Sequence, residues 1–284
     1  MTSKNYIEIF MKIIDFHYHP LSPLVDFLPQ PMGLLRKRNP EWVKRFANIP
    51  SARDILSFLD EEEIDYAVLL AERIPTVTGI ISNEYVASLC KGEPRLIPFC
   101  SINPALDIHM DVMLEKLVKE GFKGIKLWPS YQHFYPNQQN LYPLYATAQK
   151  LGIPILYHIG TSVFEGTKLK YCDPIYLDEV AVDFPKLNIV MAHAGRGFWY
   201  DKAFTLASLH KNIFLEISGL PPSKLLEYFP RLGRIGSKII FGSDYPDVTS
   251  IKKNVDYIKT LPLEPSVIEA ILGLNADKLL KIFA

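Results

Sequence analysis

The sequence predicts an α/β protein that folds as a (β/α)8 or TIM barrel, and two features of its hydrophobic pattern carry this prediction. Short apolar segments rich in Ile, Val and Leu recur along the 284 residues, and helical patterns separate them. Strands of a parallel sheet are covered on both faces, so nearly continuous apolar runs are typical of them. With 48% hydrophobic residues the chain can bury a sizeable core, and we expect residues 1–284 to form a single domain.

Eight segments have the strand pattern. They are residues 12–20, 65–72, 95–104, 122–129, 153–160, 187–195, 213–219 and 238–246. An open, doubly wound sheet is the alternative for such an alternation, but that fold is typically marked by a Gly-rich phosphate loop, which we do not find here. Eight strand–helix units therefore favour the closed barrel.

Helical patterns fill most of the gaps between these strands. They cover residues 51–64, 107–121, 141–152, 173–185, 200–211, 223–233 and 251–261. The first begins at Ser51, a suitable N-cap, with Asp54 three residues later, and the second ends at Gly121, a natural helix stop. Residues 264–284 predict one or two extra helices that close the structure.

Residues 20–50 interrupt the repeat after the first strand. This Pro-rich insertion is longer than an ordinary loop, and loops of this length are usually functional or disordered. Its aromatic and apolar residues indicate a packed cap over the barrel mouth; they are Phe27, Leu28, Trp42 and Phe46. We interpret the short basic run at 36–38 as a solvated loop.

Composition limits the class of protein. Lys and Arg together number 31, as do Asp and Glu, so no charge excess favours nucleic acid as a partner. The three cysteines include no CxxC pair, which argues against a zinc ribbon or a disulfide framework. No apolar run is long enough to cross a membrane, and the first residues lack a signal-peptide pattern. We therefore expect a cytoplasmic protein without nucleic-acid or membrane partners.

Polar side chains are concentrated where the predicted strands end. Six of them are capable of metal binding or proton transfer: His17, His19, Lys126, His158, His193 and Asp244. In a (β/α)8 barrel the C-terminal ends of the strands form one rim, where active sites are assembled. We therefore expect these six side chains to converge, although they span most of the chain.

The residue types at this rim favour a metal site. His17 and His19 are two residues apart in a strand, so both side chains leave the same face. Imidazoles and a carboxylate are ligands that suit Zn²⁺ or a similar divalent ion. Any one of these histidines alone is more often a packed core residue, and Asp244 alone would suit a turn. Their joint occurrence predicts His17, His19, His158 and Asp244 as metal ligands.

Six motifs occur in order from about residue 12 to the end of the chain. They are IDFHYH, GFKGIKLWP, IPILYHIG, FPKLNIVMAHAGRG, FGSDYP and GLNADKLLKI. On these motifs the sequence resembles the amidohydrolase superfamily, and in particular its amidohydrolase 2 branch. That branch contains metal-dependent hydrolases and decarboxylases related to aminocarboxymuconate-semialdehyde decarboxylase.

The resemblance implies the same four metal ligands and adds two roles. His193 matches a histidine that acts on the substrate or on metal-bound water. Lys126 matches a position that in other branches holds a carboxylated lysine between two metals. In this branch one ion is commoner than two, so Lys126 is alternatively a free amine that binds an anionic substrate. We expect one Zn²⁺ ion, with Mn²⁺ as the alternative.

The reaction that follows is hydrolysis of a small-molecule ester, lactone or amide by a metal-activated water. Asp244 is expected to be the general base, with His193 and Lys126 as further catalytic residues. A barrel that binds a small molecule without catalysing a reaction is a further alternative, and the complete ligand set argues against it. Barrels of this kind often form pairs, so a homodimer is the candidate assembly.

The alternative reaction is non-oxidative decarboxylation of an aromatic or dienoic carboxylic acid. It needs the same metal ligands and a cation that binds the substrate carboxylate. Arg196 and Arg73 follow predicted strands and are the candidates for that cation. Trp128 lies at the end of the fourth strand, where its ring is placed to flank a flat substrate.

Overall fold

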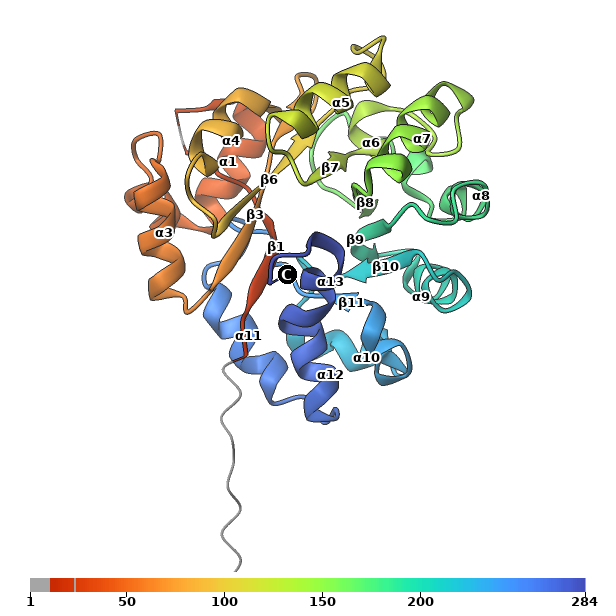
Figure 1. The fold of residues 1–284 in the computed structure, drawn as a ribbon. Helices are drawn as coiled ribbons and strands as arrows, with labels where there is room; N and C mark the ends of the chain where they lie inside the picture. The colour runs from red at the N-terminus through yellow and green to blue at the C-terminus, as the bar shows by residue number, and fades with distance from the viewer. Residues whose placement is uncertain (1–10, 23, 284) are drawn as a thin grey trace, which may run out of the picture.

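The computed structural model describes residues 11–22 and 24–283, and its centre is one sheet of eight parallel strands. The strand order is β1-β3-β6-β7-β8-β9-β10-β11. The strands are β1 (Ile14–Tyr18), β3 (Tyr66–Leu70), β6 (Leu96–Ser101), β7 (Gly124–Leu127), β8 (Ile155–Gly160), β9 (Ile189–Arg196), β10 (Ile213–Glu216) and β11 (Ile239–Ile240). They form a ring with helices around it (Figure 1), which confirms the predicted TIM barrel.

The seam between the first and last strands brings distant residues together. β11 has only two residues, so most of the predicted strand 238–246 is irregular. The ring is completed there by single hydrogen bonds: Asp244 N–H donates to His17 O at 2.9 Å, and His19 N–H donates to Tyr245 O at 2.9 Å. The seam therefore places Asp244 beside the two histidines of β1.

Helices surround the ring of strands. The outer helices are α3 (Ala52–Glu61), α4 (Asn83–Cys90), α5 (Met110–Lys119), α7 (Tyr142–Leu151), α8 (Tyr176–Asp183), α9 (Tyr200–Leu209), α10 (Leu225–Tyr228) and α11 (Ile251–Lys259). Each predicted helical pattern contains one of them. The exception is α4, which fills the gap where no pattern was predicted; Ser82 caps it by accepting a hydrogen bond from Tyr85 N–H at 3.1 Å. Within the described residues, none of the helices combines the length and apolar character needed to cross a bilayer.

The core has two layers. A large cluster lies between the strands and the outer helices, and a smaller one fills the ring itself. Ala276 and Leu279 of α13 (Asn275–Leu280) belong to the inner cluster together with Ile14 and Phe99. Figure 1 shows α13 lying across the ring, and α12 (Pro265–Glu269) beside it. These two elements confirm the predicted extra helices and leave the opposite end of the barrel for the site.

The Pro-rich insertion is a packed cap with its own secondary structure. It contains β2 (Asp26–Phe27), α1 (Pro29–Arg38) and α2 (Pro40–Arg45), and β2 joins a small antiparallel sheet with β5 (Gly79–Ile81) and β4 (Glu72–Ile74). Of its four predicted cap residues, Trp42 and Phe46 are buried, whereas Phe27 and Leu28 are half-buried. The interpretation of residues 36–38 as a loop was wrong, because they form the last turn of α1.

Candidate metal centre and active site

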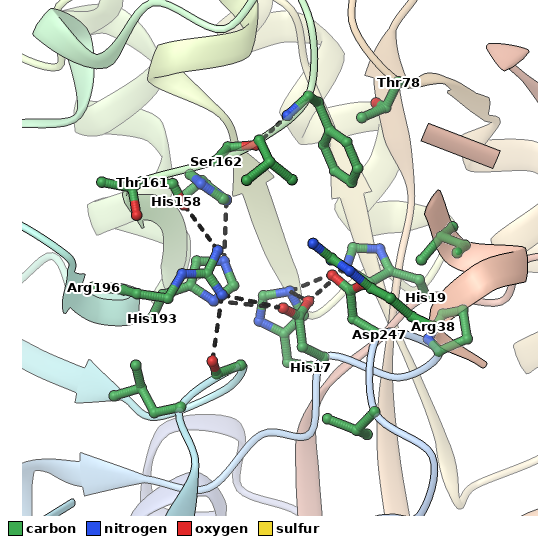
Figure 2. Close-up of a pocket in the computed structure, with 18 of the residues that line it drawn as sticks. His17, His19, Arg38, Thr78, His158, Thr161, Ser162, His193, Arg196 and Asp247 are labelled. Atoms are coloured by element: carbon green, nitrogen blue, oxygen red, sulfur yellow. Dashed lines mark hydrogen bonds and ion pairs between the residues drawn. The ribbon is translucent and has the colours of Figure 1, made fainter. Parts of the chain in front are cut away.

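Five of the six predicted polar residues line one cavity at the C-terminal ends of the strands: His17, His19, His158, His193 and Asp244. Figure 2 labels the four histidines. The cavity has a volume of about 460 Å³. Apolar and aromatic side chains from the barrel and from the cap form much of its remaining wall, including Phe27, Leu35, Tyr131 and Phe164. This size and lining are typical of a site for a small molecule.

Three of these residues form a compact donor set. One donor atom from each of His17, His19 and Asp244 lies within 4.8 Å of the other two. The Nε2 atoms of the two histidines are 3.2 Å apart, and Asp244 Oδ1 lies 3.3 Å from the first and 3.4 Å from the second. Two imidazoles and a carboxylate converging in this way are suited to a divalent metal ion.

Buried carboxylates orient both imidazoles of the set. His17 Nδ1 lies 2.9 Å from Glu216 Oε2, and His19 Nδ1 lies 2.7 Å from Glu72 Oε1. Thr78 Oγ1 in turn donates to Glu72 Oε2 at 3.0 Å. Metal-binding histidines commonly hold a carboxylate at the ring nitrogen that does not face the ion. The arrangement turns both Nε2 atoms toward Asp244 and therefore fits a metal ion.

The charges of the set are consistent with this role. Burial holds the pKa of His17 well below its usual value, so its imidazole is neutral and able to act as a ligand. Burial also acts to lower the pKa of His19, but the carboxylates of Glu72 and Asp244 outweigh it and raise that pKa to about 9. Burial acts to raise the pKa of Asp244, but the surrounding histidines outweigh it and hold that pKa well below its usual value. A bound cation would replace the proton on His19.

His158 and His193 form a second pair beside the donor set. His158 Nδ1 lies 3.0 Å from His193 Nε2, and His193 Nδ1 lies 3.1 Å from Ser218 O. His158 Nε2 is buried and has no hydrogen-bond partner among the described residues, so it is free to bind a ligand. His158 is not part of the compact three-residue set, and its assignment as a fourth metal ligand stays a prediction.

Backbone strain is concentrated at the same positions. His193, Ala194 and Asp244 have φ angles of 65°, 47° and 66°, a left-handed region that non-glycine residues seldom adopt. Such conformations cost free energy and persist at sites where the surrounding structure enforces them. Here they occur at His193, inside β9, and at Asp244, four residues after the end of β11, and both side chains line the cavity.

Lys126 lies on β7, fully buried, and is not among the residues that line the cavity. Its Nζ has no hydrogen-bond partner in the described part of the chain and lies 5.4 Å from the centre of the Trp128 ring. Burial lowers the pKa of Lys126 to about 8, although nearby carboxylates, with Glu216 foremost, oppose this shift. Its catalytic role stays a prediction.

The three predicted substrate-binding residues differ in position. Arg196 and Trp128 line the cavity, and Arg196 Nη1 lies 3.9 Å from Asp244 Oδ2. Arg73 does not line it; its Nη2 lies 3.1 Å from Asp107 Oδ1. Because Arg73 is not among the described residues that line the cavity, a substrate contact for it stays a prediction from the sequence.

Three residues that sequence reasoning missed belong to the site: Glu72, Glu216 and Arg38. Glu216 is the one charged residue in the apolar segment 213–219, and Glu72 ends the segment 65–72, so the signal that identified Lys126 would have found both. Arg38 lies on α1 and lines the cavity. No local pattern separates it from its basic neighbours.

Replacing Glu216 by Gln is expected to weaken metal binding by about 10- to 100-fold, because the amide is a poorer partner for His17 Nδ1. The affinity is measured by competition with a chromophoric chelator. Glu227→Gln is the control, since Glu227 pairs with Lys224 on the surface. Equal metal affinity in the two variants would refute an orienting role for Glu216.

Gly242 has no side chain, and the Glu216 carboxylate occupies the space where one would be. A Cβ atom at position 242 would overlap Glu216 Oε1 and lie 2.7 Å from the Cβ of His17. Gly242→Ala is therefore expected to lower the free energy of unfolding by about 1–3 kcal/mol. Gly33→Ala on α1 meets nothing within 4 Å and is expected to raise it by about 0.5–1 kcal/mol. Urea unfolding of both variants checks the opposite signs.

Comparisons with known proteins find a matching family model and solved structures with the same fold. A family model described as amidohydrolase matches residues 14–282. Among solved structures, an uncharacterized TIM-barrel protein from Bordetella bronchiseptica aligns with a TM-score of 0.79 at 23% identity, over 96% of this chain and 99% of that one. At such identity the likeness shows the fold.

Most of the other similar solved structures with a named activity are decarboxylases, and one is a probable hydrolase; one example of each follows. A 5-carboxyvanillate decarboxylase from Novosphingobium aromaticivorans, complexed with manganese and 4-hydroxy-3-methoxy-5-nitrobenzoic acid, has a TM-score of 0.70 and 14% identity, over 95% of this chain and 96% of that one. A probable 2-pyrone-4,6-dicarboxylic acid hydrolase from Acinetobacter baumannii, with citric acid bound, has a TM-score of 0.64 and 17% identity, over 95% and 100%. The shared fold therefore carries both kinds of reaction.

Proposed function

This chain belongs to the amidohydrolase family, and from that premise we propose that it hydrolyses a small-molecule ester, lactone or amide with the help of a divalent metal ion. The observation that carries this proposal is that the two carboxylate oxygens of Asp244 face different groups of residues. Oδ1 faces His17 and His19, whereas Oδ2 lies 3.7 Å from His193 Nδ1 and 3.9 Å from Arg196 Nη1. One carboxylate thus joins the ligand set and remains available for proton transfer.

The metal would be held by His17, His19 and Asp244, with His158 Nε2 as the fourth ligand. When bound, a divalent ion supplies Lewis acidity toward a substrate oxygen and makes water a better nucleophile near neutral pH. The family is metal-dependent, and a manganese-bound neighbour shares the fold. We favour Zn²⁺ for a set of imidazoles and one carboxylate, with Mn²⁺ as the alternative.

The proton steps are assigned to side chains of this chain. Asp244 Oδ2 accepts a proton from the attacking water as the oxygen of that water bonds to the substrate carbonyl carbon. The same carboxyl then gives the proton to the leaving alcohol or amine as its bond to carbon breaks. His193, whose Nδ1 lies 3.7 Å from Asp244 Oδ2, exchanges protons with that carboxyl during the reaction. Arg196 binds an acidic group of the substrate, and Trp128 packs against its body.

Decarboxylation of an aromatic or dienoic acid is the second candidate, and one observation favours it. Arg196 places a guanidinium within 3.9 Å of Asp244, where a substrate carboxylate would meet a cation close to the donor set. A neighbour in fold is named as a decarboxylase of an aromatic acid. The two reactions use the same residues and differ in whether water is consumed or CO₂ is released.

The test compares products. The purified protein, stripped with a chelator and reloaded with Zn²⁺ or Mn²⁺, is incubated with lactones, esters and amides in H₂¹⁸O and with aromatic acids labelled at the carboxyl carbon. We expect ¹⁸O in the product acid, and turnover that is lost on chelation and restored by metal. Labelled CO₂ would instead establish the decarboxylase. Turnover that survives complete metal removal would overturn both proposals.

A further inference from the structure

Two guanidinium groups reach the cavity from different parts of the chain. Arg196 ends β9 in the barrel, and Arg38 ends α1 in the Pro-rich insertion, and both line the cavity. Figure 2 shows Arg196 and Arg38 extending from opposite sides, with His17 between them in this view. Their side chains are 26% and 41% exposed, so both remain accessible to a solute that enters the cavity.

The position of Arg38 is fixed by the residue that follows it. Asn39 is buried, and its Nδ2 donates to Pro246 O at 3.1 Å and to Val248 O at 2.8 Å. Its Oδ1 accepts a hydrogen bond from Trp42 N–H at 3.0 Å, which caps α2. The end of α1 is therefore tied to the segment just after Asp244, and Arg38 is presented to the cavity from an anchored support.

Each guanidinium keeps donors for a ligand. Arg38 Nη1 lies 2.7 Å from Asp247 Oδ1, and among the described residues its guanidinium makes no other hydrogen bond. Arg196 donates through Nη2 to Thr161 O at 2.9 Å and through Nη1 to Gly219 O at 3.5 Å, a weak contact. A guanidinium has five N–H donors in a planar fork that matches a carboxylate. Arg196 can therefore bind an acidic group without losing its present partners, whereas Arg38 would share its guanidinium between the ligand and Asp247.

We propose that Arg38 and Arg196 together select substrates with two acidic groups, one bound near Asp244 by Arg196 and the other bound at the mouth by Arg38. This inference rests on the proposed function, because it names the class of substrate for the same site. Asp247 holds Arg38 in place and competes with the ligand for it. The cavity volume of about 460 Å³ accommodates a small dicarboxylate with an apolar body between its charged ends.

The test measures binding rather than turnover. Glutarate and valerate have the same number of carbons but two and one carboxylates, and their affinity for the metal-loaded and the chelator-stripped protein is measured by calorimetry. In both forms we expect glutarate to bind at least about tenfold more tightly than valerate, since each charged hydrogen-bonding partner contributes about one decade of affinity. Arg38→Gln should weaken glutarate binding about tenfold and leave valerate binding nearly unchanged.

Two further variants make the result decisive. Asp247→Asn removes the competing carboxylate and should strengthen glutarate binding by about threefold. Arg36→Gln is the matched control, because it removes the same charge from the same turn of α1. Arg36 does not line the cavity, so its replacement should leave glutarate affinity unchanged. Thermal unfolding shows whether each variant is folded. Equal glutarate affinity in Arg38→Gln, Arg36→Gln and the unmodified protein would overturn the inference.

Failure of the inference and failure of the proposed function give different results. If esters and lactones are not hydrolysed but glutarate binding depends on Arg38, the proposed reaction is wrong and the two-cation recognition holds. If hydrolysis is metal-dependent but Arg38→Gln leaves both glutarate affinity and the KM of acidic substrates unchanged, the reaction holds and the inference is wrong.

Discussion

Asp244→Asn is expected to lower kcat/KM by about a thousandfold while the protein remains folded. The amide cannot accept a proton from water, and it is a weaker metal ligand than the carboxylate. Asparagine has nearly the same shape as aspartate and tolerates the left-handed backbone, with φ of 66°, that Asp244 adopts. The change therefore removes the chemistry and leaves the seam of the barrel in place.

Activity and metal content are measured on the same sample of this variant at a saturating concentration of metal. Activity that stays low in the metal-loaded variant is then due to loss of the general base and not to loss of the metal. Asp256→Asn is the control, because Asp256 makes only a surface ion pair with Lys252 on α11. Near-normal turnover in Asp244→Asn would mean that another group is the base, and the assignment of roles to the two carboxylate oxygens would be wrong.

The barrel and most of the rim could be predicted because both depend on local patterns. The strands are nearly continuous apolar runs, and a polar residue inside such a run is costly unless it has a partner or a function. That logic identified His17, His19 and Asp244, which the fold brings within 4.8 Å of one another. It depended only on side-chain alternation along a strand and on the rule that parallel strands end at one rim.

The contacts between residues of distant segments could not be predicted in the same way, even where the residues themselves have a local signal. Glu216 lies 199 residues from His17, and only the closed ring reveals their contact. The helices of the insertion were missed for another reason. Pro29 and Pro40 each occupy the first position of a helix, where proline is favoured because its missing N–H would be unpaired there anyway. Prolines that were interpreted as loop residues thus begin α1 and α2, and Arg38 was missed with them.

The closed seam also makes Asp15→Ala the substitution with the largest expected effect on stability. Asp15 is fully buried, and its carboxylate accepts hydrogen bonds from His17 N–H at 3.1 Å, Ser243 N–H at 2.8 Å and Ser243 Oγ at 2.6 Å. Alanine would leave all three donors buried without this partner. We expect the free energy of unfolding to fall by about 3–5 kcal/mol, since each unpaired buried donor costs about 1–3 kcal/mol.

Asp15→Asn is the matched comparison for this substitution. Its remaining amide oxygen can still accept from both backbone N–H groups, so the expected loss is about 1 kcal/mol. Urea unfolding measures both variants. Because Ser243 precedes Asp244 and the His17 N–H belongs to a residue of the proposed metal site, Asp15→Ala should also weaken metal binding more than Asp15→Asn does. If Asp15→Ala proved as stable as the unmodified protein, the hydrogen bonds of Asp15 would not be what closes the barrel beside the site.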